Sequence, residues 1–276
     1  MKKYKTDLER IDAAWKKLEP FLEEEKKPKM LTLKRLSIAA SLFLMMALGV
    51  VFWQGRYGQN GYATGYGQTA RVVLPDGSVV TLNGNSRLKV PKYWPAKGDR
   101  EVQVEGEAYF SIQHTTTHQK FFVRMENSTS VEVLGTEFNV SNRAAETEVV
   151  LSSGRIAMHL PSRKGTQEHV VEMKPGDLVL YRKSDRYYNK KAVNPAHYTS
   201  WKSSKLLFED TQLKEVLDIL KDTYGMKIIV DDPAILKRTI SGSAPTKNVD
   251  LLIGALSEIL DLTFTKKGNT LMITSK

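Results

Sequence analysis

The sequence predicts an α+β protein that combines one membrane-spanning helix, an all-β part and a small α+β part at the C-terminus. Three patterns indicate this: an uncharged apolar run over 36–53, short strand-like runs separated by turn residues over 69–183, and alternating helical and extended periodicity over 204–276. The chain would then have a tail at 1–35, a linker at 54–68 and a second linker at 184–203.

The composition excludes several classes of function. The 276 residues include no cysteine, which excludes disulfides, thiol nucleophiles and thiolate metal sites. The formal net charge is +10, but no stretch combines a dense basic run with interleaved aromatic residues. We therefore expect a solvated basic surface and no direct contact with nucleic acid.

The apolar run from Leu36 to Trp53 contains no charged residue and would extend ~27–30 Å as a helix, which matches the hydrocarbon core of a bilayer. Trp53 and Tyr57 lie where an interfacial aromatic belt is expected. Five positive charges precede the run, between Lys26 and Arg35. The positive-inside rule then predicts a bacterial inner-membrane protein with a cytoplasmic N-terminus and a periplasmic C-terminal bulk.

The tail has the spacing of a short amphipathic helix over residues 4–25. Ile11, Trp15 and Leu18 belong to its apolar stripe, and we expect them to bind a partner or the membrane surface. A frayed amphipathic linker is the alternative interpretation of the same pattern.

Turn residues organise the part of the chain that follows. PDGS (Pro75 to Ser78) and NGNS (Asn83 to Ser86) separate strand-like runs, and no helical pattern intervenes before about Trp201. This predicts an all-β unit, either a sandwich or a solenoid-like stack. From about Trp201 we expect the order strand, helix, strand, strand, helix, strand, strand, with Gly225 just past the first helix.

The Gly135–Thr136 step interrupts a strand-like run, VEVLGTEFNV, from Val131 to Val140. A threonine hydroxyl can attack the preceding carbonyl and convert the amide to an ester that water cuts, so the step is a candidate for self-cleavage. The alternative, which we favour, is a glycine bulge in a strand followed by an ordinary strand residue.

No motif in the chain predicts a cofactor or a metal site. His114 and His118 have the i, i+4 spacing of a helical zinc pair. In an extended strand they would stand ~13 Å apart on one face. A pair in a loop is the alternative, and we expect no metal there.

Several motifs in order resemble the FecR family of transmembrane anti-sigma regulators. These are LPDGSVVTLNGNSRLKVPKYW, REVQVEGEAYFSI, VEVLGTEFNV, VVLSSGRIAM and PGDLVLY, between about Gly67 and Tyr181. The run from Leu206 to Val230 resembles the C-terminal domain that accompanies FecR, which looks like the STN domains of secretins and TonB-dependent transporters. The similarity covers about three quarters of the chain.

The resemblance implies a signalling pathway rather than an enzyme. The signalling domain of a TonB-dependent outer-membrane transporter would contact the C-terminal part in the periplasm. The tail would hold an extracytoplasmic-function sigma factor and release or help activate it. Some relatives are thought to be cut at a matching Gly-Thr step.

The tail is shorter than the cytoplasmic region of the relatives that the chain resembles. The segment from Ile11 to Phe21 is similar to the one that precedes the membrane in longer relatives. We expect that the start lies upstream or that the sigma-binding module is reduced. An alternative function follows: a membrane-anchored periplasmic binding or assembly module without sigma-factor control.

Overall fold

A computed structural model describes the backbone of residues 2–22, 30–94, 98–143, 146–161, 168–246 and 248–275. Within these ranges the side chains are described except at 2–8, 20–22, 30–35, 51–57, 127 and 168. The chain divides into two compact units, Met1–Arg56 and Tyr57–Lys276, and each is described here by itself.

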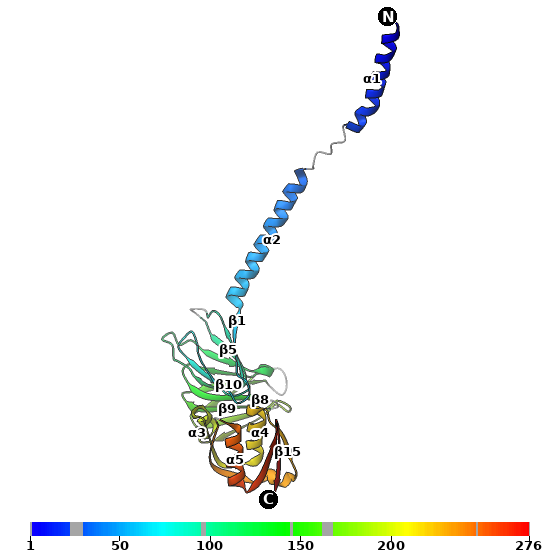
Figure 1. The fold of residues 1–276 in the computed structure, drawn as a ribbon. Helices are drawn as coiled ribbons and strands as arrows, with labels where there is room; N and C mark the ends of the chain where they lie inside the picture. The colour runs from blue at the N-terminus through cyan, green and yellow to red at the C-terminus, as the bar shows by residue number, and fades with distance from the viewer. Residues whose placement is uncertain are drawn as a thin grey trace. The chain divides into compact units, whose positions relative to one another are not determined.

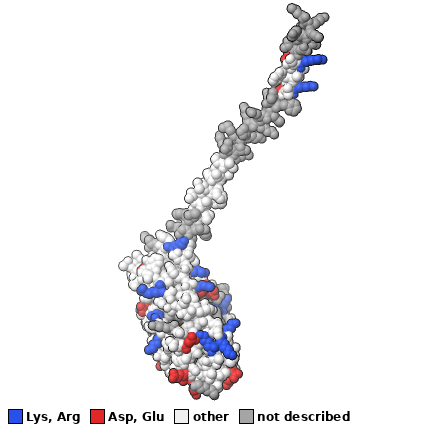
Figure 2. Space-filling view, viewed as in Figure 1, with Lys and Arg blue, Asp and Glu red and all other residues white. Residues whose placement is uncertain are grey.

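The first unit consists of two helices, α1 (Lys2–Leu22) and α2 (Met30–Tyr57) (Figure 1). In the part of the chain that the structure describes, no helix has the combined length and apolarity that a membrane crossing requires. By this finding the predicted membrane-spanning helix at 36–53 is corrected, although the side chains described in α2, at 36–50, carry no charge (Figure 2). Trp53, Tyr57 and the basic run from Lys26 to Arg35 lie outside the described side chains.

The second unit begins with thirteen strands that form one sheet. Their bounds are β1 (Gln59–Ala63), β2 (Ala70–Val73), β3 (Val79–Leu82), β4 (Arg87–Pro91), β5 (Arg100–Ser111), β6 (Phe121–Arg124), β7 (Ser130–Val133), β8 (Glu137–Arg143), β9 (Glu146–Ser153), β10 (Ile156–Pro161), β11 (Glu168–Met173), β12 (Asp177–Arg182) and β13 (Tyr187–Ala192). A 3₁₀ turn, η1 (Glu126–Ser128), joins β6 to β7.

The long strand β5 holds this sheet together. Its first half pairs with β4 and β6, and its second half pairs with β3 and β8. Gly106 lies between the halves with φ +84°, a conformation that side chains with a Cβ rarely adopt, and this lets the strand change direction. The main strand order is β11-β10-β7-β6-β5-β8-β9-β12-β13, and the sheet curls as a half-barrel (Figure 1).

Alternating residues from these strands fill the inside of the curl. The core includes two aromatic pairs: Phe110 stacks on Phe138 with centroids 5.0 Å apart, and Trp94 meets Phe121 edge-on at 5.8 Å. The strands show the period-2 burial that places one face inside, as in β4, where Leu88 and Val90 are buried between exposed neighbours.

The predicted fold class is wrong in two respects. More of the described residues lie in strands than in helices, so the protein is mostly β rather than α+β overall. The β part is neither a sandwich nor a solenoid-like stack, because β5 belongs to both halves and makes them one curled sheet. Strands also occur where linkers were predicted: β1 lies within 54–68 and β13 within 184–203.

The chain then forms a smaller part with its own core. The elements are α3 (Pro195–Thr199), η2 (Ser200–Ser203), β14 (Lys205–Gln212), α4 (Leu213–Tyr224), β15 (Lys227–Val230), η3 (Pro233–Lys237), β16 (Thr239–Pro245), α5 (Val249–Leu260), β17 (Leu262–Lys267) and β18 (Thr270–Ser275). From β14 onward the order of strands and α-helices is the predicted one.

Two small sheets and two helices enclose this second core. β14 pairs with β16, and β15, β18 and β17 form a three-stranded sheet in which β15 runs parallel to β18. The apolar stripes of α4 and α5 are buried against them, including Leu213, Leu220, Leu252 and Leu256 at 0% exposure.

Candidate functional site

The Gly135–Thr136 step lies between two strands rather than within one. β7 ends at Val133 and β8 begins at Glu137. β7 pairs with β6 and β10, whereas β8 pairs with the second half of β5 and with β9. The prediction of one continuous strand from 131 to 140 is therefore wrong, because the chain crosses here from one half of the sheet to the other. The only register shift of β8 lies one residue later, between Glu137 and Phe138.

Thr136 is bound on both its main chain and its side chain. Its N–H donates to Ile112 O at 3.2 Å, its carbonyl accepts from Ile112 N at 3.0 Å, and its hydroxyl donates to Arg155 O at 3.0 Å. The side chain is buried, with 4% exposure. A backbone carbonyl is not a general base, so this geometry directs the hydroxyl proton to an acceptor that cannot activate it.

The His114–His118 pair lies in a turn, not in a strand. The ring nitrogens Nδ1 of His118 and Nε2 of His114 are 2.9 Å apart, far closer than the ~13 Å expected for an extended chain. The turn is fixed by His118 N donating to Thr115 O at 3.0 Å. Among the described residues, no group of three or more His, Asp or Glu side chains could hold a metal ion.

A buried arginine anchors the loops around this region. Arg100, with 2% exposure, forms an ion pair with Asp76. Its guanidinium also donates to three backbone carbonyls, those of Gln113 at 3.0 Å, Gln119 at 2.8 Å and Leu134 at 3.3 Å. The carbonyl of Leu134 immediately precedes Gly135. Sequence reasoning missed this residue, because nothing local distinguishes a buried arginine from a surface one.

The three predicted partner-binding residues of the tail lie in α1 with most of their surface exposed. Ile11 is 53% exposed, Trp15 58% and Leu18 52%. Their binding role stays a prediction.

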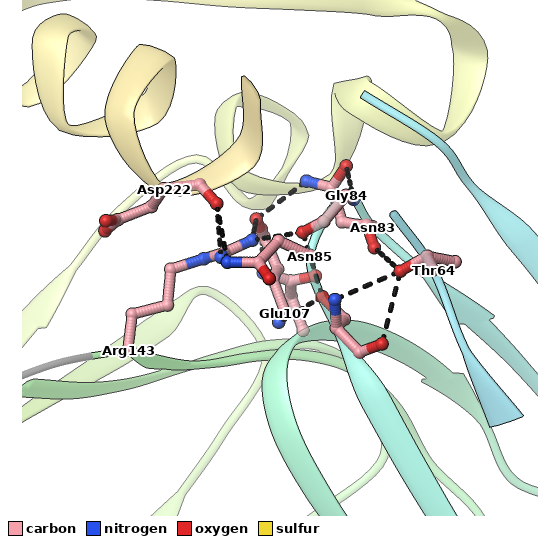
Figure 3. Close-up of polar contacts among 9 residues, drawn as sticks. Thr64, Asn83, Gly84, Asn85, Glu107, Arg143 and Asp222 are labelled. Carbon is pink, nitrogen blue, oxygen red and sulfur yellow. Dashed lines mark hydrogen bonds and ion pairs between the residues drawn. The ribbon is translucent and has the colours of Figure 1, made fainter. Parts of the chain in front are cut away.

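The most elaborate polar site joins the β part to the C-terminal part within the second unit (Figure 3). The turn between β3 and β4 contacts the last turn of α4, and we call this contact the junction. Gly84 is required there: a Cβ would lie 2.5 Å from Thr223 O and 2.9 Å from Gly67 N, distances that real Cβ atoms do not show. The NGNS motif, predicted as a turn, is therefore also a contact surface.

Donors from the β part satisfy the free carbonyls at the end of α4. Arg143 Nη1 donates to Asp222 O at 3.0 Å, Asn85 Nδ2 donates to the same oxygen at 3.2 Å, and Gly67 N donates to Thr223 O at 2.8 Å. The last carbonyls of a helix lack intrahelical partners and carry partial negative charge, so an arginine is a favourable partner for them. Figure 3 shows the Asp222 carboxylate turned away from this contact.

Arg143 also ties the helix end to the turn. Its Nη2 donates to Gly84 O at 2.9 Å and lies 3.8 Å from Glu107 Oε2. The Glu107 carboxylate accepts further hydrogen bonds from Asn83 Nδ2 at 2.8 Å and Asn139 Nδ2 at 3.0 Å. The turn, β5, β8 and α4 thus share one hydrogen-bond network.

An apolar contact accompanies this network. Tyr109 projects from β5 into the second core, in the same buried cluster as Trp201. Lys202 Nζ lies 3.0 Å from the centre of the Tyr109 ring, a cation–π contact. Burial, and then the charge of Glu137, raise the pKa of Tyr109 to about 12, so its hydroxyl stays protonated and donates to Glu137 Oε2 at 3.1 Å.

A half-buried carboxylate lies on β9, the strand that α3 contacts. Burial raises the pKa of Glu148, on β9, to about 7, and the nearby carboxylates of Glu107, Glu215 and Glu146 add to the rise while Lys191 opposes it. Tyr198 of α3 is also close, because Glu148 and Glu215 contribute to raising the pKa of its hydroxyl, after burial, to about 12. The β part and the C-terminal part therefore meet across a group that titrates near neutral pH.

The junction was beyond sequence reasoning because its members are far apart in the chain. Arg143 and Asp222 are separated by 79 positions, and Asn85 and Asp222 by 137. Only the NGNS turn and the glycine after α4 gave a local signal. The arrangement offers amide and guanidinium donors to carbonyls, which holds two parts together but performs no acid–base or nucleophilic chemistry.

Comparison with protein-family models assigns both parts. Residues 60–157 match FecR protein, and residues 205–273 match FecR, C-terminal. The protein thus combines a FecR sheet with the C-terminal region that accompanies it, and the chain belongs to the FecR family. The predicted likeness of the C-terminal part to STN domains stays a prediction.

Solved structures share this fold. Two crystal structures of a protein from Parabacteroides distasonis, provisionally assigned as an anti-sigma factor, match with TM-scores of 0.67 and 0.66. In both, the identity is 23%, and the match covers 79% of this chain and 99% of the other. Comparison with curated proteins gives no match.

Proposed function

We propose that this protein is an anti-sigma regulator that acts by contacts between proteins and not as an enzyme. The observation that carries the proposal is the pair of family matches in order along one chain, FecR at 60–157 and FecR C-terminal at 205–273. The fold shared with the protein provisionally assigned as an anti-sigma factor supports it. The hydroxyl of Thr136 donates to the backbone carbonyl of Arg155, which cannot activate it as a nucleophile, and this supports a role without catalysis.

In this proposal the two ends of the chain meet different partners. The tail holds an extracytoplasmic-function sigma factor through Ile11, Trp15 and Leu18, whose apolar side chains are exposed. The C-terminal part meets the signalling domain of a TonB-dependent transporter. The junction couples the C-terminal part to the FecR sheet, because the hydrogen bonds of Arg143 must break if either part is to move alone.

The location at the bacterial inner membrane, with the C-terminal bulk in the periplasm, stays a prediction. The basic flank from Lys26 to Arg35 supports it. Fractionation of cells that express the tagged chain tests it: the tag should sediment with inner-membrane markers. Recovery in the soluble fraction would exclude that location.

The function is tested by affinity purification of the tagged full chain from native cells, with partners identified by mass spectrometry. We expect a sigma factor and a transporter with the wild-type chain. A Trp15→Ala/Leu18→Ala variant should lose the sigma factor and keep the transporter. A Lys16→Ala variant, also in α1, serves as the matched control and should keep both.

Two results would count against the proposal. Recovery of a transporter without a sigma factor would favour a binding or assembly module without sigma-factor control. Recovery of the sigma factor by the Trp15→Ala/Leu18→Ala variant would show that the tail residues do not hold it.

A further inference from the structure

The C-terminal part contains a groove between α4 and β15, closed by η3. Its floor is apolar and its rim is charged. The β part contributes Tyr66 to its lining. The apolar lining residues of the C-terminal part are Leu217, Met226, Ile228, Val230 and Leu236, and the charged ones are Lys214, Asp218, Lys221 and Lys227. The groove encloses about 590 Å³, within the range of binding clefts. A helix beside a strand is a surface that can take an extended peptide.

The strand that borders the groove has a free edge. β15 pairs with β18, and among the described residues no strand pairs with its other side. Lys227 N donates to Asn269 O at 2.8 Å and Asp231 N to Ile273 O at 3.1 Å, both toward β18. Because N–H groups alternate along a strand, those of Ile228 and Val230 face the open edge. Their side chains lie in the groove, so one extended segment could meet both the N–H groups and the floor.

The rim of the groove favours an acidic occupant. Lys214 is 3.9 Å from Asp218, an ion pair within α4. In the described part of the chain, neither Lys221 nor Lys227 forms an ion pair within 4.0 Å, and both are exposed. Burial raises the pKa of the Asp222 carboxyl, and Lys221 lies near enough to oppose that rise, without an ion pair within 4.0 Å. Two exposed ammonium groups beside an open edge attract carboxylates and disfavour a basic segment.

We propose that the β15 edge and its groove bind an extended, acidic segment of a partner protein by adding it as a strand, with alternate apolar side chains on the groove floor. The inference deepens the proposed function, because it names the surface by which the C-terminal part meets its partner. It does not depend on the identity of that partner.

A second copy of this chain fits the groove less well. Two β15 edges could pair, but the inward side chains Ile228 and Val230 of each copy already pack against their own core. The second copy would therefore leave both grooves unfilled. A separate extended segment brings its own apolar side chains and fills the floor.

The test uses purified full-length chain and two synthetic peptides, Ac-EVEVEVE-NH₂ and Ac-KVKVKVK-NH₂. We expect the acidic peptide to bind at least tenfold more tightly by fluorescence anisotropy. A third peptide, Ac-EPEVEPE-NH₂, has lost two of the N–H donors and should bind at least tenfold more weakly than the first. Hydrogen exchange should slow at the amides of Ile228 and Val230 when the acidic peptide binds.

A variant with reversed charge at the two rim lysines tests whether they attract the acidic peptide. Lys221→Glu/Lys227→Glu changes exposed side chains only and should lower the affinity for the acidic peptide at least tenfold. Lys205→Glu, at another exposed lysine, on β14, should leave the affinity unchanged. Equal binding of the two charged peptides, unchanged exchange at Ile228 and Val230, or β15-mediated dimers by light scattering would each overturn the inference. None of these outcomes bears on sigma-factor recovery, so the two proposals fail separately.

Discussion

Arg100 carries its charge inside the FecR sheet, where it neutralises Asp76 and holds three loop carbonyls. Removing one partner of a buried ion pair leaves the other charge without compensation. We therefore expect Arg100→Met to lower the free energy of unfolding by about 3–5 kcal/mol, measured by urea denaturation. Arg87→Met is the control, because that side chain is 72% exposed and its 3.5 Å pair with Glu105 should be worth less than about 1 kcal/mol.

The double variant Arg100→Met/Asp76→Leu separates charge from packing. Without either charge, the buried site has no unpaired ion, so part of the lost stability should return. If the double variant is less stable than Arg100→Met alone, the loops depend on the arginine for their shape and not on neutralisation of Asp76.

Glu148 makes stability depend on pH in a defined direction. Its pKa in the folded protein, about 7, lies above the ordinary 4.5 of a glutamate, so the folded state binds the proton more tightly. Stability is then highest below the ordinary pKa and falls as pH rises through the window from 4.5 to about 7. Glu148→Gln should remove this fall and raise the free energy of unfolding at pH 8.5 by about 1–3 kcal/mol relative to wild type.

The comparison at pH 5.5 tests the cause. There the gain from Glu148→Gln should be smaller than at pH 8.5, because part of the wild-type Glu148 is protonated. Glu172→Gln, an exposed position on β11, is the control and should behave as wild type at both values. An equal gain at the two pH values would mean that the substitution acts through packing and not through titration.

At the scale of the elements, local chemistry predicted turns and helix ends but not the pairing of strands. The turn at Pro75–Ser78 forms as expected, with Leu74 N donating to Ser78 O at 2.8 Å, and α4 ends before Gly225 as expected. The dual role of β5 could not be predicted, because a 12-residue strand has the same sequence pattern whether it keeps the same neighbours along its length or bends to join two halves of a sheet.

The same limit explains the error at Val131–Val140. Apolar residues recur at every second position in each strand, Val131 and Val133 in β7 and Phe138 and Val140 in β8, so the residues on both sides of the crossing favour a strand. What ends β7 is tertiary: Thr136 pairs with Ile112 and Arg155, residues distant in sequence. The favoured strand placement of the histidine pair was wrong for a related reason, because the turn at Thr115–His118 has no glycine or proline to mark it.

The crossing from β7 to β8 gives a prediction for the Gly135–Thr136 step. Because the Thr136 hydroxyl donates to a carbonyl, we expect no cleavage, and the purified wild-type chain should run as one full-length band. Thr136→Ala should also run as one band and lose about 1 kcal/mol of stability, the usual net value of one hydrogen bond. Two fragments in wild type that disappear in Thr136→Ala would contradict this and restore the self-cleavage hypothesis.

At the scale of the whole second unit, two cores depend on one junction. The FecR sheet and the C-terminal part each bury their own apolar cluster, which would allow them to unfold separately. The junction opposes this, because Arg143 and Gly67 of one part satisfy the helix end of the other. Nothing in either part's local sequence indicates that coupling; it follows only from the folded arrangement.

We therefore expect the two cores of the wild-type full chain to unfold with the same urea midpoint. Pulsed hydrogen exchange with mass spectrometry can follow β12 and α5 separately. Arg143→Ala removes two hydrogen bonds to carbonyls from a charged donor, each worth about 1.5–3 kcal/mol, and should separate the midpoints. Gly84→Ala should do the same by forcing a Cβ against Thr223 O.

Two matched controls distinguish loss of coupling from general weakening. Arg124→Ala removes an exposed 3.1 Å pair with Glu101, and Gly61→Ala adds a Cβ with no atom within 4 Å, so neither should separate the midpoints. If the wild-type cores already unfold at different urea concentrations, the junction does not couple them. A signal received by the C-terminal part would then need another route to the FecR sheet, such as the apolar contact of Tyr109 with the second core.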